Sequence, residues 1–172
     1  MSDLARLYAE IALLRRGPQD VPASFLLLAL TVLGYCAVNL LVDLLLPTPS
    51  EPWLAILAIG VVFTLGWYAA LLGVLRRGER LLQTMTAVFG YRTVLSPASI
   101  ASEWLIRRFG TDAAWQLPLV VLYTAVVVWM IAVNSHILKA ALEWSTLQCV
   151  ALVVLEILAG GLLVIAIVPL PR

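Results

Sequence analysis

Four long apolar blocks constrain the fold of this chain more than any other feature. They cover residues 24–46, 53–75, 117–138 and 145–168, and short polar connections separate them. An α-helix rises about 1.5 Å per residue, so a block of about 20 apolar residues can cross the roughly 30 Å of hydrocarbon in a bilayer. The blocks therefore predict an all-α, polytopic transmembrane helical bundle.

Composition argues against a water-soluble fold. Of the 172 residues, 63% are hydrophobic and 12% are charged, whereas a soluble domain carries about 45–50% apolar and about 25% charged residues. We expect the lipid bilayer to cover the excess apolar surface. The net charge is only +1, and nucleic-acid binding, which needs a clustered basic face, is not expected.

The segment before the first block predicts a different kind of helix. In residues 2–16 the apolar side chains recur at spacings of three and four, which places them on one face of a helix. This helix is expected to lie in the membrane interface and to end before Pro18. We therefore divide the chain into an interfacial amphipathic helix, residues 1–17, and a single transmembrane domain, residues 18–172. The apolar face of the helix consists of Leu4, Leu7, Ile11 and Leu14.

Residues 81–106 are the ambiguous part of the topology. The segment is long enough to cross the bilayer but contains Arg92 and Pro97. If it stays at the surface there are four spans, and more of the basic residues then face the cytoplasm, as the positive-inside rule prefers. If it crosses there are five spans, with the N-terminus in the cytoplasm.

Glu156 favours the crossing, because an unpaired carboxylate in the middle of a span is unfavourable and usually has a partner. Arg92 and Glu156 lie equally far from the predicted cytoplasmic ends of their blocks, Leu81 and Ser145, so five spans bring them to similar depth. A bidentate, mutually neutralising ion pair is then expected. The predicted spans are about 24–46, 53–75, 81–106, 117–138 and 145–168.

Three short motifs resemble those of small bacterial membrane proteins related to the Yip family. They are RRGPQDVPAS before the first block, LLQTMTAVFG at the start of the ambiguous segment, and NSHILKAALE between the last two blocks. The resemblance implies five spans, a cytoplasmic N-terminus and a bacterial inner (cell) membrane. Eukaryotic Yip proteins are associated with membrane trafficking and small GTPase partners, a role that does not pass automatically to a bacterial chain. Arg92 and residues 101–116 are more polar than the resemblance implies, which predicts a third span that is kinked or partly interfacial around Pro97.

Arg92 and Glu156 form the main candidate site. The pair is expected either to fix helix packing or to act as a proton or ion relay. The structural role is favoured, because coupled transporters usually show internal repeats or interrupted helices, and neither is visible in the sequence. Among the other intramembrane polar residues, Asn39, Asp43 and His136, we expect Asp43 to reach toward the following loop and His136 to form interfacial hydrogen bonds.

Small residues at helical spacings are candidates for helix packing, since in lipid they allow two backbones to approach closely. The sequence leaves open whether they pack within this bundle or against another protein. They are Gly66, Ala69, Ala70, Gly73, Gly160 and Gly161.

Tryptophans near the predicted ends of the spans are expected to be interface anchors and not parts of a substrate site. They are Trp53, Trp104, Trp115 and Trp144.

No enzyme motif is present in the sequence, and we expect no catalytic residues, cofactor or metal. Cys36 and Cys149 lie in apolar blocks, where a thiol is most often a packing group. The leading hypothesis is therefore a non-catalytic membrane scaffold or organiser of Yip-like type, which associates with other membrane proteins or with itself. The alternatives are an accessory subunit of a larger inner-membrane complex and, more weakly, a small proton- or ion-coupled transporter that uses Glu156 and Arg92.

Overall fold

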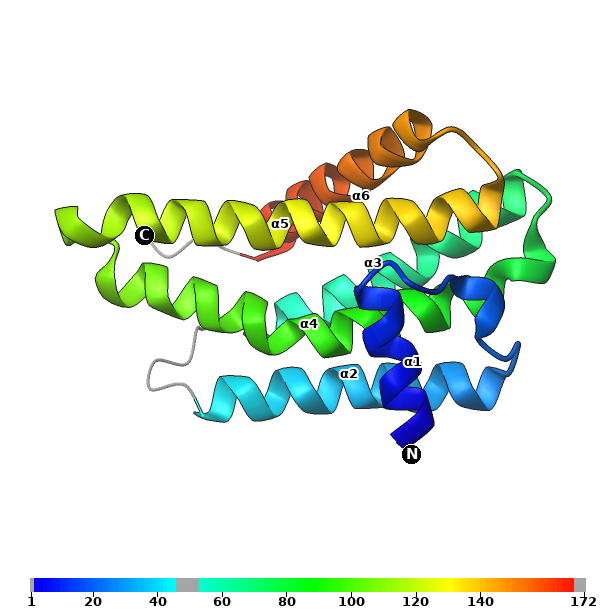
Figure 1. The fold of residues 1–172 in the computed structure, drawn as a ribbon, viewed down its shortest axis with the longest axis horizontal. Helices are drawn as coiled ribbons and strands as arrows, with labels where there is room; N and C mark the ends of the chain where they lie inside the picture. Colours follow the sequence, from blue (N-terminus) through cyan, green and yellow to red (C-terminus); the bar gives the residue numbers. More distant parts are fainter. Residues whose placement is uncertain (1, 46–52, 169–172) are drawn as a thin grey trace.

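The computed structural model describes residues 2–45 and 53–168. Over these residues the chain forms helices and short turns without strands, which confirms the predicted all-α class (Figure 1). Two 3-10 turns, Pro18–Asp20 and Gly78–Arg80, precede the second and fourth helices in the connections. The α-helices are α1 (Ser2–Ala12), α2 (Phe25–Leu45), α3 (Trp53–Val74), α4 (Leu81–Phe109), α5 (Ala113–Leu142) and α6 (Thr146–Ile167).

Four of the helices, α2, α3, α5 and α6, are long and apolar enough to cross a membrane. They coincide with the four predicted apolar blocks, although α5 is longer at both ends than the block at 117–138. The α5 helix begins early because the carboxylate of Asp112 accepts a hydrogen bond from the Ala114 amide at 3.0 Å and caps the first turn. It continues past Lys139 and ends before Glu143, which adopts a left-handed φ of 60°.

The fourth helix, α4, holds the bundle together. In Figure 1 it lies between α2 and α5, and it contacts both helices. The α3 and α6 helices pack against each other. In addition, α3 contacts α4, and α6 contacts α5. Every residue from Thr84 to Tyr91 is buried. Pro97 lies within α4 without ending it. A helix enclosed by other helices needs no continuous apolar surface, which explains why α4 is more polar than its neighbours.

The first helix is shorter than predicted. The helix expected over residues 2–16 ends at Ala12, because Leu14 adopts a left-handed φ of 60° and leaves the helical path. Leu14 is therefore not part of the helical apolar face, while Ile11 is fully buried. In Figure 1, α1 crosses α2 and α4 at a steep angle.

Two side-chain contacts fasten α1 to the bundle. The hydroxyls of Tyr8 and Thr31 on α2 are 2.7 Å apart, and the indole N–H of Trp129 on α5 donates to the carbonyl of Ala12 at 2.9 Å. The ring of Tyr8 also lies over Gly90 of α4, where a Cβ would collide with it. The α1 helix is thus packed on the side of the bundle.

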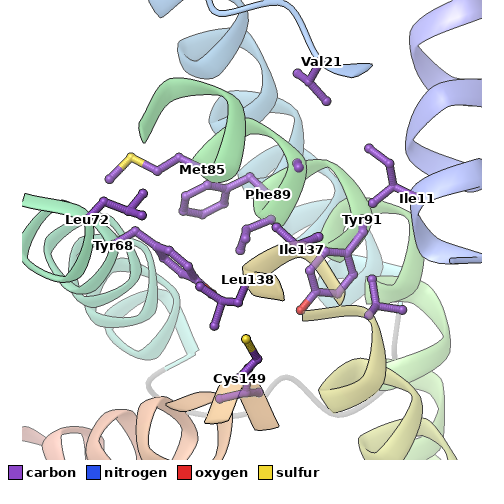
Figure 2. Packing of buried hydrophobic residues seen from close by; sticks show 14 of the residues in the cluster. Ile11, Val21, Tyr68, Leu72, Met85, Phe89, Tyr91, Ile137, Leu138 and Cys149 are labelled. Atoms are coloured by element: carbon purple, nitrogen blue, oxygen red, sulfur yellow. The ribbon is translucent and has the colours of Figure 1, made fainter. Parts of the chain in front are cut away.

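The hydrophobic core lies in one half of the bundle, and Figure 2 shows its packing from close by. It gathers the end of α3, the start of α4, the end of α5 and the start of α6, with Ile11 and Val21 closing it from the N-terminal segment. Cys149 is buried in this core with a free thiol, as expected for a packing cysteine. The large buried side chains at its centre include Tyr68, Leu72, Phe89, Tyr91, Ile137 and Leu138.

Candidate functional site

Arg92 on α4 and Glu156 on α6 form an ion pair inside the bundle. Arg92 Nη2 lies 2.7 Å from Glu156 Oε1, and the side chains are only 18% and 3% exposed. The pair is not bidentate as expected: Arg92 Nη1 donates instead to the hydroxyl of Thr64 on α3 at 2.8 Å, and the buried Nε has no partner among the described protein groups. One guanidinium therefore joins three helices.

The second oxygen of Glu156 is held by two residues that sequence reasoning did not single out. Its Oε2 accepts hydrogen bonds from Asn134 Nδ2 on α5 and from the Tyr68 hydroxyl on α3, both at 3.0 Å. The Tyr68 hydroxyl is also 3.0 Å from Asn134 Oδ1, so its single proton has two acceptors to choose between. Donors around both carboxylate oxygens are what a buried charge requires.

A sequence signal for part of this network does exist. Thr64 and Tyr68 are four residues apart and so share one face of α3. Both are also buried, as is Asn134, in helices that otherwise expose apolar side chains. A search for polar residues at helical spacing within each apolar block would have found the α3 pair, but not its contact with α5 and α6.

A cavity of about 810 Å³ extends from this network into the half of the bundle opposite the core. We call it the vestibule. Its walls come from the second half of α2, the first halves of α3 and α5, and the second halves of α4 and α6. Arg92 and Glu156 lie where the vestibule meets the packed core, so they form its floor.

The vestibule explains the polar residues of α4. Arg92, Ser96, Ser99, Glu103 and Arg107 all line it, and their spacings of three and four place them on one helical face. This polar stripe therefore lines a cavity, and its last two members, Glu103 and Arg107, are also exposed. Polar residues of membrane helices are normally found facing such cavities.

Asn39 and Asp43 line the vestibule from α2, the helix next to α4, while His136 does not line it. Asn39 Nδ2 donates to Ser96 Oγ at 3.1 Å and to the Tyr35 carbonyl at 2.8 Å, which ties α2 to α4. Asp43, expected to reach toward the loop, lines the vestibule one turn further along α2. The site thus combines four of the five predicted polar residues.

Two of the four tryptophans lie beside the vestibule. Trp53 at the start of α3 and Trp104 on α4 both line it. That the tryptophans act as interface anchors stays a prediction.

The candidate packing residues lie in three different places. A Cβ at Gly160 on α6 would lie 3.1 Å from the Phe63 ring on α3, so this glycine allows α3 and α6 to approach closely. A Cβ at Gly161 would meet nothing within 4 Å, and this residue lines the vestibule. The remaining four are exposed along one face of α3, where no other described helix covers them: Gly66, Ala69, Ala70 and Gly73.

A separate ionic cluster lies at the other end of the bundle, outside the core. Glu143 accepts from Arg80 at 2.7 Å and from Arg77 at 3.1 Å. Arg80 also donates to the carbonyls of Ala140 and Ala141, which closes the last turn of α5. The hydrogen bond from Arg80, aided by the charge of Arg77, lowers the pKa of the exposed Glu143 carboxyl below its ordinary value.

Comparison with known proteins adds no family name. Neither the family models, nor the curated proteins, nor the solved structures that were compared with this chain gave a match. Over the described ranges 2–45 and 53–168, no group of three His, Cys, Asp or Glu side chains is arranged to hold a metal ion.

Proposed function

We propose that this chain is a five-span protein of a bacterial inner membrane, with α4 as its third span and a cytoplasmic N-terminus. The 29 residues of α4 extend about 43 Å, which is enough to cross the hydrocarbon. Its polar stripe lines the vestibule, and its one deeply placed charge is paired with Glu156. These placements support a crossing, because they give the charges of α4 surroundings other than lipid.

The position of α1 supports an interfacial helix in this topology. Its Tyr8 contacts Thr31, which lies about 9 Å along α2 from Phe25. Interfacial helices lie about 5–10 Å into the boundary between headgroups and acyl chains. With α1 at the cytoplasmic boundary, Arg76, Arg77, Arg80 and Lys139 lie on the same side of the membrane. Arg107 and Arg108 at the end of α4 then lie on the outer side, which is why the positive-inside rule alone prefers four spans.

A reporter inserted at Gly110, in the connection between α4 and α5, tests this topology. Five spans place Gly110 in the periplasm, so alkaline phosphatase fused there should be active, while the same enzyme fused at Glu79 should be inactive. Activity of a cytoplasmic reporter at Gly110 would show that α4 does not cross.

For its biological role, we propose a non-catalytic scaffold or organiser of Yip-like type that acts by associating with membrane helices. The observation that carries this proposal is the exposed face of α3 formed by Gly66, Ala69, Ala70 and Gly73. Lipid chains need no small residues beside them, whereas an approaching helix does, because close backbone contact is a main source of affinity in a bilayer. An accessory subunit of a larger complex would use the same face, and this is the alternative role.

Native purification followed by mass spectrometry tests the role of this face. We expect the wild-type chain to associate with itself or a partner, and Gly66→Leu and Gly73→Leu to lose that association while remaining folded. Ala151→Leu is the matched control, because Ala151 is exposed on α6 outside this face. A partner at fixed stoichiometry would indicate the accessory subunit, and association unchanged by either α3 variant would contradict both roles.

A small proton- or ion-coupled transporter is a second candidate, favoured by the vestibule and the ion pair at its floor. This arrangement resembles a site open to one side, with the packed core closing the other. The test is proton-coupled uptake in proteoliposomes. Uptake that disappears in Glu156→Gln while the variant stays folded would favour the transporter over the scaffold.

A further inference from the structure

Polar residues of two neighbouring helices line the same side of the vestibule. The α4 stripe forms part of this side, and Asn39 and Asp43 of α2 lie next to it. The α2 and α4 helices run in the same direction (Figure 1), and the hydrogen bond between Asn39 and Ser96 places these two residues at the same height along the helix axes. Asp43 then lies about 6 Å, and Glu103 about 10 Å, beyond this bond along the helix axes.

The charges of the vestibule do not balance. Arg92 and Glu156 neutralise each other at the floor. Above them, neither Asp43 nor Glu103 has an Arg, Lys or His nitrogen within 4 Å among the described residues, and the only other cationic group of the lining is Arg107, one turn beyond Glu103 toward the rim. The part of the vestibule above its floor, toward the rim where Glu103 is exposed, therefore carries excess negative charge.

Aromatic rings make up much of the remaining wall. The faces of such rings attract cations, most strongly where water is excluded. The rest of the lining is largely aliphatic, and the volume of about 810 Å³ lies within the range of about 300–1,000 Å³ typical of sites for drug-sized molecules. The aromatic residues are Tyr35, Trp53, Phe63, Phe89, Trp104 and Tyr123.

We infer that the vestibule is a binding site for an organic cation with a large apolar body, whose charge lies between Asp43 and Glu103 and whose body contacts the aromatic wall. An inorganic cation would leave the apolar wall unused, and an anion would meet the two carboxylates. The inference goes beyond the scaffold role, because association through the exposed face of α3 requires no ligand in the vestibule.

Binding of radiolabelled tetraphenylphosphonium to the full chain in nanodiscs tests the site, with empty nanodiscs as the background. We expect saturable binding, and a dissociation constant about fivefold or more weaker in Asp43→Asn and in Glu103→Gln. Glu79→Gln is the matched control, because Glu79 is an exposed carboxylate outside the vestibule. Absence of saturable binding, or equal weakening in the control, would overturn the inference.

Two further measurements separate charge recognition from general hydrophobic binding. Neutral triphenylphosphine oxide should compete at least about tenfold more weakly than unlabelled tetraphenylphosphonium, since it lacks the full charge. Equal competition would overturn the cation assignment. Gly161→Leu narrows the vestibule without altering its charge. It should therefore weaken binding of the bulky cation, and unchanged binding would overturn the placement of the ligand in the vestibule.

Discussion

Arg92 Nη2 lies 2.7 Å from Glu156 Oε1, and this contact joins α4 to α6 across the floor of the vestibule. Removal of one partner leaves the other charge unpaired although its side chain is mostly buried, since Arg92 and Glu156 are only 18% and 3% exposed. We therefore expect Arg92→Leu and Glu156→Gln each to lower the free energy of unfolding, by about 3–5 kcal/mol if they behave as other buried pairs do. Thermal unfolding of the purified variants in detergent measures the effect.

The double variant distinguishes a structural pair from two independent residues. Because Arg92→Leu with Glu156→Gln leaves no unpaired charge, it should recover part of the stability that either single change removes. Losses that simply add would show that the pair does not couple α4 to α6.

The pair shows how far the sequence could predict the site. Arg92 and Glu156 could be matched in depth because each lies on a helix with a fixed rise per residue. The contacts of Tyr68 and Asn134 could not be predicted, because they depend on the rotation of α3 and α5 about their own axes. The vestibule could not be predicted for the same reason. The spacing of Ser96, Ser99 and Glu103 indicates a polar face, but it does not indicate whether that face contacts protein, lipid or water.

At the end of the bundle outside the core, the Glu143 cluster predicts a pH dependence of stability. The pKa of Glu143 is lowered from its ordinary value of 4.5 by the hydrogen bond from Arg80. A carboxyl with a depressed pKa stabilises the folded state above its unfolded pKa, and this contribution is lost as the pH falls from about 4.5 through the folded pKa. Wild type should thus exceed Glu143→Gln in melting temperature by a constant margin at neutral pH, and the margin should shrink below about pH 4.5.

High salt provides the control for this prediction, because the Glu143 pairs are exposed and their charges are screened. The margin at neutral pH should become smaller as the salt concentration rises. A margin that is independent of both pH and salt would mean that Glu143 acts through the shape of the α5–α6 turn and not through its charge.

Tyr8 and Gly90 give a packing prediction for α1. Because the Tyr8 ring occupies the space of a Cβ on residue 90, Gly90→Val should displace α1 at a cost of about 1–3 kcal/mol, typical of overpacking. In limited proteolysis, the protease should then cut the variant within residues 2–21, which are protected in the wild-type chain. Gly66→Val is the control, since a Cβ there meets nothing within 4 Å. Tyr8→Ala combined with Gly90→Val should restore protection, and failure to do so would show that the clash with the Tyr8 ring is not what displaces α1.

The vestibule itself predicts a pattern of chemical accessibility. Ser99 lines it, whereas Val62 is 70% exposed on the outer face of α3, which the five-span proposal places against lipid. In a background with Cys36 and Cys149 replaced by alanine, Ser99→Cys should react with a charged thiosulfonate more than about tenfold faster than Val62→Cys, because the reaction requires a thiolate in water. Tetraphenylphosphonium should slow labelling at Ser99→Cys if the cation occupies the vestibule. Equal rates at the two positions would mean that the polar stripe of α4 is sealed from water, and the stripe would then serve only to connect α4 to its neighbours.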